Sequence, residues 1–164
     1  MGPTKALVTA TALLMSATAQ ADPLTDMAGP WTGSGWARET VEGPREKVRC
    51  KLTNTFDKAA FTLTVSGKCV VPGRKLSLAG KLRGKAGSEQ VTGRWFNPDG
   101  IGSTAINGIR RNSIIAFTFR ATDPASGQVM SQNVEWRVEP EMLRLRATDR
   151  AQPDVMMSDM TFTR

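Results

Sequence analysis

The sequence contains no histidine and no tyrosine among its 164 residues. The absence of histidine removes the usual general base, the commonest zinc ligand and the usual axial ligand of haem. Neither a Ser-His-Asp nor a Cys-His catalytic site can be built from this chain. We therefore expect a protein that is not an enzyme and that uses no metal ion and no other cofactor.

Motifs for phosphate binding and redox chemistry are also missing. Residues 80–86 have three residues between their glycines, where a P-loop has four, and no Ser or Thr follows. The tripeptide Gly33-Ser34-Gly35 lacks the third glycine of a dinucleotide site. The carboxylates form no cluster of the kind that calcium requires. These observations leave binding, and not catalysis, as the expected class of function.

Residues 1–21 have the features of a cleavable secretory signal peptide. Lys5 precedes a short apolar run over residues 6–15, which is too short to remain as a membrane anchor. Ala19-Gln20-Ala21 then places small residues at the two positions that a signal peptidase recognises. We expect cleavage after Ala21 and a periplasmic or secreted protein. The other interpretation is a buried N-terminal helix.

The mature chain is basic. Removing Lys5 with the signal leaves 21 basic and 15 acidic residues, a net charge of +6. This balance favours an anionic membrane surface or an acidic protein as partner, and export argues against nucleic acid. Candidate residues for such a surface alternate along two predicted strands: Lys47, Arg49, Lys51, Arg144 and Arg146. The alternative is that these charges only keep the outer wall soluble and its edges unpaired.

Apolar and polar residues alternate with a period of two, which predicts half-buried antiparallel strands. Leu63 and Val65 alternate with Thr62 and Thr64, and the same period recurs in four further runs. Turn signals such as Asn97-Pro98-Asp99-Gly100 separate these runs. The connections are too short for crossover helices, so neighbouring strands should be antiparallel.

These patterns predict an all-β fold with about 8–10 strands. An up-and-down meander of that size closes most simply into an antiparallel barrel, because closure removes the two exposed edges. A two-sheet sandwich is the competing architecture. We expect a single barrel domain over residues 29–164, preceded by a flexible leader over residues 22–28.

Two cysteines are present, Cys50 and Cys69. In an exported chain an even pair predicts a disulfide. The closed loop of about twenty residues would contribute on the order of 3 kcal/mol by restricting the unfolded chain. The alternative is a pair of free thiols.

The tripeptide Gly29-Pro30-Trp31 stands at the start of the first predicted strand. It resembles the Gly-x-Trp with which calycin barrels begin, the lipocalin-like and fatty-acid-binding-protein-like proteins. In many of them the indole closes one end of the barrel under a basic residue of the last strand. The resemblance implies a structural closure made by Gly29, Trp31 and Arg164, with a cation–π contact. The alternative is that Trp31 is an ordinary core aromatic.

A second resemblance is to the small periplasmic inhibitors of bacterial metalloproteases. It rests on Ala28-Gly29-Pro30-Trp31, on the two cysteines and on the run over residues 95–100. In that family the N-terminal leader enters the protease cleft, a role that would fall here to residues 22–27. The resemblance implies an alternative function, a protein-binding module that acts through its leader and rim loops. This chain is longer than the family pattern.

The interior of the predicted barrel is the expected binding site. We expect an apolar or amphipathic small molecule there, bound through burial of hydrocarbon at roughly 25 cal/mol per Å². The candidate ligand-lining residues lie on the apolar faces of the predicted strands: Leu63, Val65, Ile115, Phe117, Trp136, Leu143 and Met160.

Overall fold

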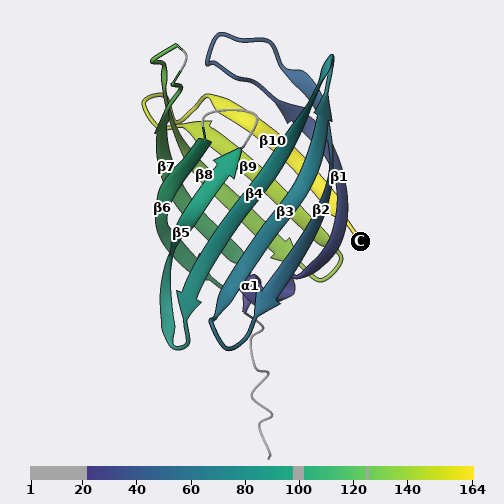
Figure 1. Cartoon of the computed structure of the whole chain (residues 1–164), viewed down its shortest axis with the longest axis vertical. Helices are drawn as coiled ribbons and strands as arrows, with labels where there is room; N and C mark the ends of the chain where they lie inside the picture. Colours follow the sequence, from purple (N-terminus) through teal and green to yellow (C-terminus); the bar gives the residue numbers. More distant parts are fainter. Residues whose placement is uncertain (1–21, 98–101, 125) are drawn as a thin grey trace, which may run out of the picture.

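The computed structural model describes residues 22–97, 102–124 and 126–164, so the predicted signal peptide lies outside the described residues. Within these ranges one short helix and ten strands follow one another along the chain (Figure 1). Their bounds are α1 (Pro23–Asp26), β1 (Gly29–Ala37), β2 (Glu46–Asp57), β3 (Thr62–Val71), β4 (Arg74–Lys85), β5 (Ser88–Asn97), β6 (Gly102–Arg111), β7 (Ile114–Thr122), β8 (Val129–Glu139), β9 (Met142–Asp149) and β10 (Met156–Thr163). No helix in the described part of the chain is long and apolar enough to cross a membrane.

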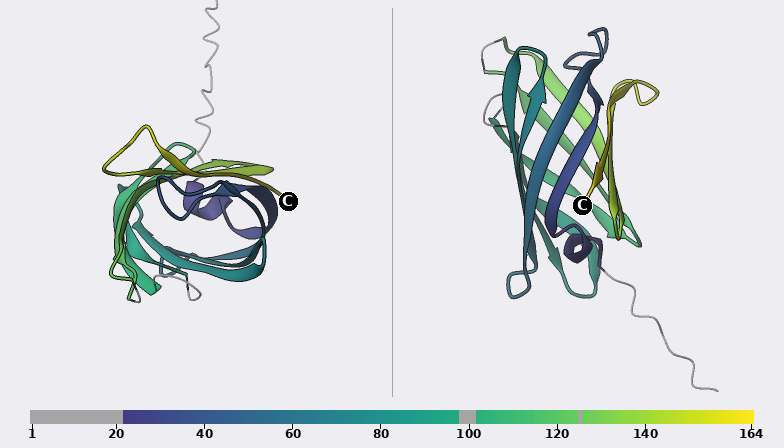
Figure 2. Two further views of the ribbon diagram at one scale, coloured as in Figure 1. Left: turned by 90° about the horizontal axis from the view of Figure 1, so that it is seen from above. Right: turned by 90° about the vertical axis from the view of Figure 1, so that its right-hand side faces the viewer.

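The ten strands form one closed antiparallel barrel. Each strand pairs with its neighbours along the chain, and β1 pairs with β10 to close the ring. This closing pair runs from Thr32 opposite Thr163 to Ala37 opposite Ser158. Seen from above, the strands surround a common interior (Figure 2). The predicted all-β antiparallel barrel is confirmed, and the two-sheet sandwich is wrong.

Two glycines let β10 approach β1 closely at this seam. A Cβ atom at Gly33 would overlap the ring of Phe162, and one at Gly35 would overlap the backbone of Asp159. A side chain at either of these two positions of β1 would therefore push the two strands apart. Gly33 and Gly35 thus allow the closing strand pair to form.

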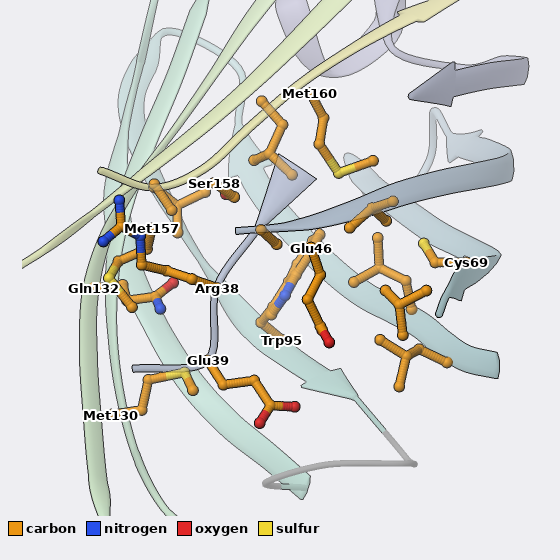
Figure 3. Close-up of a pocket in the computed structure, with 18 of the residues that line it drawn as sticks. Arg38, Glu39, Glu46, Cys69, Trp95, Met130, Gln132, Met157, Ser158 and Met160 are labelled. Carbon is orange, nitrogen blue, oxygen red and sulfur yellow. The ribbon is translucent and has the colours of Figure 1, made fainter. Parts of the chain in front are cut away.

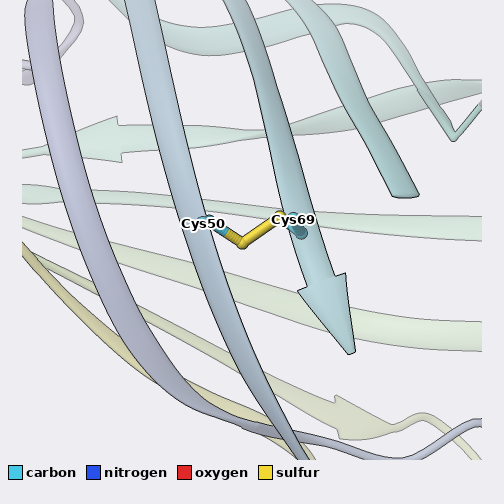
Figure 4. Close-up of a disulfide and its surroundings, with 2 residues drawn as sticks. All are labelled: Cys50 and Cys69. Carbon is cyan, nitrogen blue, oxygen red and sulfur yellow. A yellow bond between two sulfur atoms is a disulfide. The ribbon is translucent and has the colours of Figure 1, made fainter. Parts of the chain in front are cut away.

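The predicted disulfide is confirmed. Cys50 on β2 and Cys69 on β3 lie directly opposite each other, with their Cα atoms 4.0 Å apart (Figure 4). Both side chains are buried and point into the barrel, because Val48, Cys50 and Leu52 occupy the inward positions of β2. The disulfide links the β2–β3 hairpin from inside the barrel.

Residues 22–27, here called the plug, close one end of the barrel (Figure 1). Leu24 and Met27 are fully buried there, and the Asp22 carboxylate accepts a hydrogen bond from the backbone N–H of Leu24 at 3.0 Å. The expectation of a flexible leader over residues 22–28 is therefore wrong. The sequence of this segment does indicate a helix, because Asp at the N-cap followed by Pro is typical of a helix start.

Candidate functional site

A cavity of about 590 Å³ occupies the end of the barrel opposite the plug. Its lining includes Ala37 at the end of β1, Val48 near the start of β2 and Met157 near the start of β10. All three positions lie far from the closed end, where β1 begins and β2 and β10 finish. The cavity therefore fills the upper half of the interior, and the plug fills the lower end.

The wall of this cavity is mainly apolar. Figure 3 shows Met130 and Met157 on one side and Trp95 and Cys69 on the other. The Trp95 ring also contacts the core, with its centroid 5.6 Å from that of Phe117. Methionine side chains are flexible and polarizable, so they adapt to ligands of different shape.

Several polar side chains interrupt the apolar wall, and Gln132 is one of the buried ones. Gln132 of β8 lines the cavity and is only 9 % exposed, between the inward positions of Met130 and Val134. Its side-chain amide has no hydrogen-bond partner among the described residues, and it faces the cavity (Figure 3). The amide atoms are not sealed from water, because they open onto the cavity. They are available to hydrogen-bond to a polar group of a ligand there.

Charged residues surround the rim of the cavity. Arg74, in the β3–β4 hairpin, forms ion pairs with Glu39 and with Glu46, the latter at 3.2 Å. The hydrogen bond to Glu39 raises the pKa of Arg74. Arg38 donates to the backbone carbonyl of Val41 at 2.8 Å. These ion pairs connect the β1–β2 connection to the β3–β4 hairpin. The Arg38 guanidinium forms no ion pair in the described residues.

The residues expected to line a ligand site are all buried, but they divide among three regions. Met160 lines the cavity. Phe117 lines a separate hollow between β6, β7, β8 and β9. The remaining five belong to the packed core and do not line the cavity: Leu63, Val65, Ile115, Trp136 and Leu143. They lie nearer the plug along their strands, where side chains fill the interior.

The residues expected to close the barrel come together at the plug. The Arg164 guanidinium lies 4.1 Å from the Trp31 ring centroid and donates to the carbonyls of Asp26 and Ala28. The Trp31 indole N–H donates to the carbonyl of Met27 at 2.9 Å. Gly29 has a φ of 116°, and a Cβ atom there would meet the Arg164 guanidinium. This cluster fastens the plug to the first and last strands.

Arg110 secures the other side of the plug. It ends the inward face of β6 and is only 7 % exposed. It forms an ion pair with Asp22 and donates to the carbonyls of Lys85 and Ser88. Inward positions on strands repeat every second residue, so Thr104, Ile106 and Gly108 place Arg110 inside as well.

The basic residues predicted on the surface differ in their surroundings. Lys47, Arg49 and Lys51 are exposed on the outer wall of β2. Arg144 and Arg146 are half-buried on β9, and both contact Asp159 of β10. Arg144 holds that carboxylate with two hydrogen bonds, of 3.0 and 2.8 Å. The positive charge on β9 is thus partly neutralised, whereas the charge on β2 is not.

The ion pair between Arg144 and Asp159 makes the stability of the fold depend on pH. The hydrogen bonds from Arg144 lower the pKa of Asp159 in the folded protein. Its contribution to stability is therefore present at neutral pH and is lost as the pH falls through the folded pKa. We expect D159N to be less stable than the parent near pH 7, and the difference to shrink in acid.

Urea unfolding of D159N and of the parent, from pH 7 down to strongly acidic pH, measures the difference in stability. The matched control is D154N, because Asp154 is exposed and has no ion pair among the described residues. A difference between D159N and the parent that stays constant down to strongly acidic pH would contradict the assignment.

No group of three or more Cys, Asp and Glu side chains in the described ranges is arranged to hold a metal ion. Comparison of the sequence with models of known protein families gives no match. Comparison with curated proteins also gives no match.

Proposed function

We propose that this protein is an exported, non-enzymatic carrier that binds an apolar or amphipathic small molecule in its upper cavity. The observation that carries the proposal is the cavity of about 590 Å³ with a mainly apolar wall. Pockets for small ligands commonly have volumes of about 300–1,000 Å³ and few polar groups. A closed barrel supplies such a space without exposing strand edges.

Gln132 supports an amphipathic ligand over a pure hydrocarbon. Its amide faces the cavity and offers both a donor and an acceptor. A ligand with an amide, ester or hydroxyl group at that depth would satisfy it. The rim guanidinium of Arg38 would suit an anionic or polar end group nearer to solvent.

We infer a relationship to the calycin barrels from the closed end. The closure by Trp31 and Arg164 matches what that resemblance implies, and Gly29 permits it. The number of strands and the antiparallel order are consistent with such a barrel. The relationship supports a lumen-binding role.

The alternative role as a protease inhibitor receives less support. That mechanism needs a leader free to enter a protease cleft. Here Leu24 and Met27 are fully buried, and Asp22 is held by Arg110. Withdrawing the plug would expose the lower core, so we favour the cavity as the binding site.

A fluorescent apolar probe tests the proposal directly. N-phenyl-1-naphthylamine should bind the mature protein with increased emission. A147F should weaken this binding at least about tenfold, because Ala147 lines the cavity and a phenyl ring there would occupy the ligand space. Native mass spectrometry of protein purified from its own compartment would then identify a co-purifying ligand.

The matched control is A105F, which adds the same ring on the exposed outer face of β6. It should bind the probe like the parent. Thermal unfolding of both variants checks that each remains folded. Equal probe binding by A147F and A105F, or no binding by the parent, would contradict the carrier proposal.

A further inference from the structure

The outer wall formed by β2, β3, β4 and β5 carries a dense set of cations, here called the basic face. Its members are exposed residues on outward positions of these four consecutive strands: Lys47, Arg49, Lys51, Lys68, Lys75, Lys81, Arg83 and Arg94. The strands lie side by side in the barrel (Figure 1). The eight charges therefore lie on one side of the barrel.

Like charges lie directly opposite one another within this face. Lys51 on β2 is paired in register with Lys68 on β3, and Lys81 on β4 is paired with Arg94 on β5. Like charges at directly opposed positions destabilise a sheet. Folding alone therefore does not favour this arrangement, and an external anion would remove the repulsion.

Among the described residues, the charges of the basic face have no ion-pair partners. None of its eight residues forms an ion pair within the described ranges, and Arg94 donates only to the hydroxyl of Ser103. Some cations elsewhere on the outer wall are paired, as Arg111 is with Glu89 and Arg144 is with Asp159. The basic face thus differs from those sites in that its charges cluster without ion pairs in the described residues.

We propose that the basic face docks on the anionic headgroups of a membrane surface. Five of its eight residues are lysines, which are depleted in protein–protein interfaces but suit diffuse attraction to phosphate. Among the side chains that the structure describes, the large exposed apolar residue within it is Val70, and these side chains form no aromatic cluster to anchor a protein partner. A fluid layer of negative headgroups matches this broad, polar surface.

Trp36 lies at the edge of the basic face and suits the same partner. It is half-buried on the outer face of β1, directly opposite Lys47, with the Arg45 guanidinium 4.1 Å from its ring centroid. Indole rings favour the headgroup level of membranes. The next residue, Ala37, lines the cavity, so docking at this edge brings the cavity mouth to the membrane surface.

Vesicle co-sedimentation tests the proposal. The mature protein should bind vesicles of phosphatidylcholine that contain phosphatidylglycerol, should not bind phosphatidylcholine alone, and should dissociate as salt is added. The double variant K51Q/K68Q should bind about 25-fold more weakly, at roughly fivefold for each charge removed. Because it removes a repulsive pair, this variant should keep the stability of the parent.

The matched control is R120Q/R150Q, which lowers the net charge equally at two exposed positions outside the basic face. It should bind the anionic vesicles within about threefold of the parent. Equal losses in the two double variants would show that net charge alone matters and would overturn the docking face. Binding to poly-glutamate without binding to anionic vesicles would assign the face to an acidic polypeptide and overturn the lipid proposal.

Discussion

Replacement of Arg110 by methionine is expected to lower the free energy of unfolding by about 3–5 kcal/mol. The guanidinium is buried, and burial lowers its pKa, although arginine keeps its charge in proteins. R110M would leave the Asp22 carboxylate without its partner. It would also leave the carbonyls of Lys85 and Ser88 without the donor that now lies 2.7 and 2.8 Å away. Unpaired buried groups make this loss large.

Urea unfolding at neutral pH measures this effect, with R111M as the matched control. Arg111 is the next residue and also forms an ion pair, with Glu89. The side chains of both partners are more than half exposed. The control should therefore change stability much less than R110M. The double variant R110M/D22N should be less destabilised than the sum of the single changes. Equal effects of R110M and R111M would contradict a structural role for the buried pair.

Truncation of Trp31 is expected to have a comparable effect. W31A should lower the free energy of unfolding by about 3–5 kcal/mol, because it leaves a large cavity beneath the plug. Trp31 is 1 % exposed and donates to the Met27 carbonyl. The change would also remove the aromatic face on which the Arg164 guanidinium lies.

The control for Trp31 is W36A, which removes the same side chain from the half-exposed outer face of β1. Thermal and urea unfolding should show a clearly smaller loss for W36A. W31F should fall between the parent and W31A, since phenylalanine restores part of the buried volume but not the indole N–H. Similar losses in W31A and W36A would show that Trp31 does not close the barrel.

The class of fold followed from local pattern. Side chains on a strand alternate between its two faces, so a period of two and short polar turns predict antiparallel strands without any knowledge of their neighbours. The pairing of Cys50 with Cys69 was also predictable, since the predicted export signal favours a disulfide and two cysteines leave one partner for each. Closure into a barrel followed from the need to remove exposed edges.

The position of a residue along the barrel axis was not predictable from this pattern. Leu63 and Met160 both point inward, yet the first belongs to the packed core and the second lines the cavity. The position of a residue along the barrel axis depends on the stagger between strands, which is a property of the whole closed sheet. The sequence therefore identified the interior but not which part of it is hollow.

The sequence of this protein by itself determined which side chains turn inward, that the sheet is antiparallel, and which cysteines join. Only the tertiary structure decided that residues 22–27 enter the barrel end and that Arg110 meets Asp22 there. It also decided that Lys51 lies opposite Lys68. The reason is physical: alternation is set by neighbours along the chain, whereas these contacts join residues far apart in sequence and depend on how the closed sheet is registered.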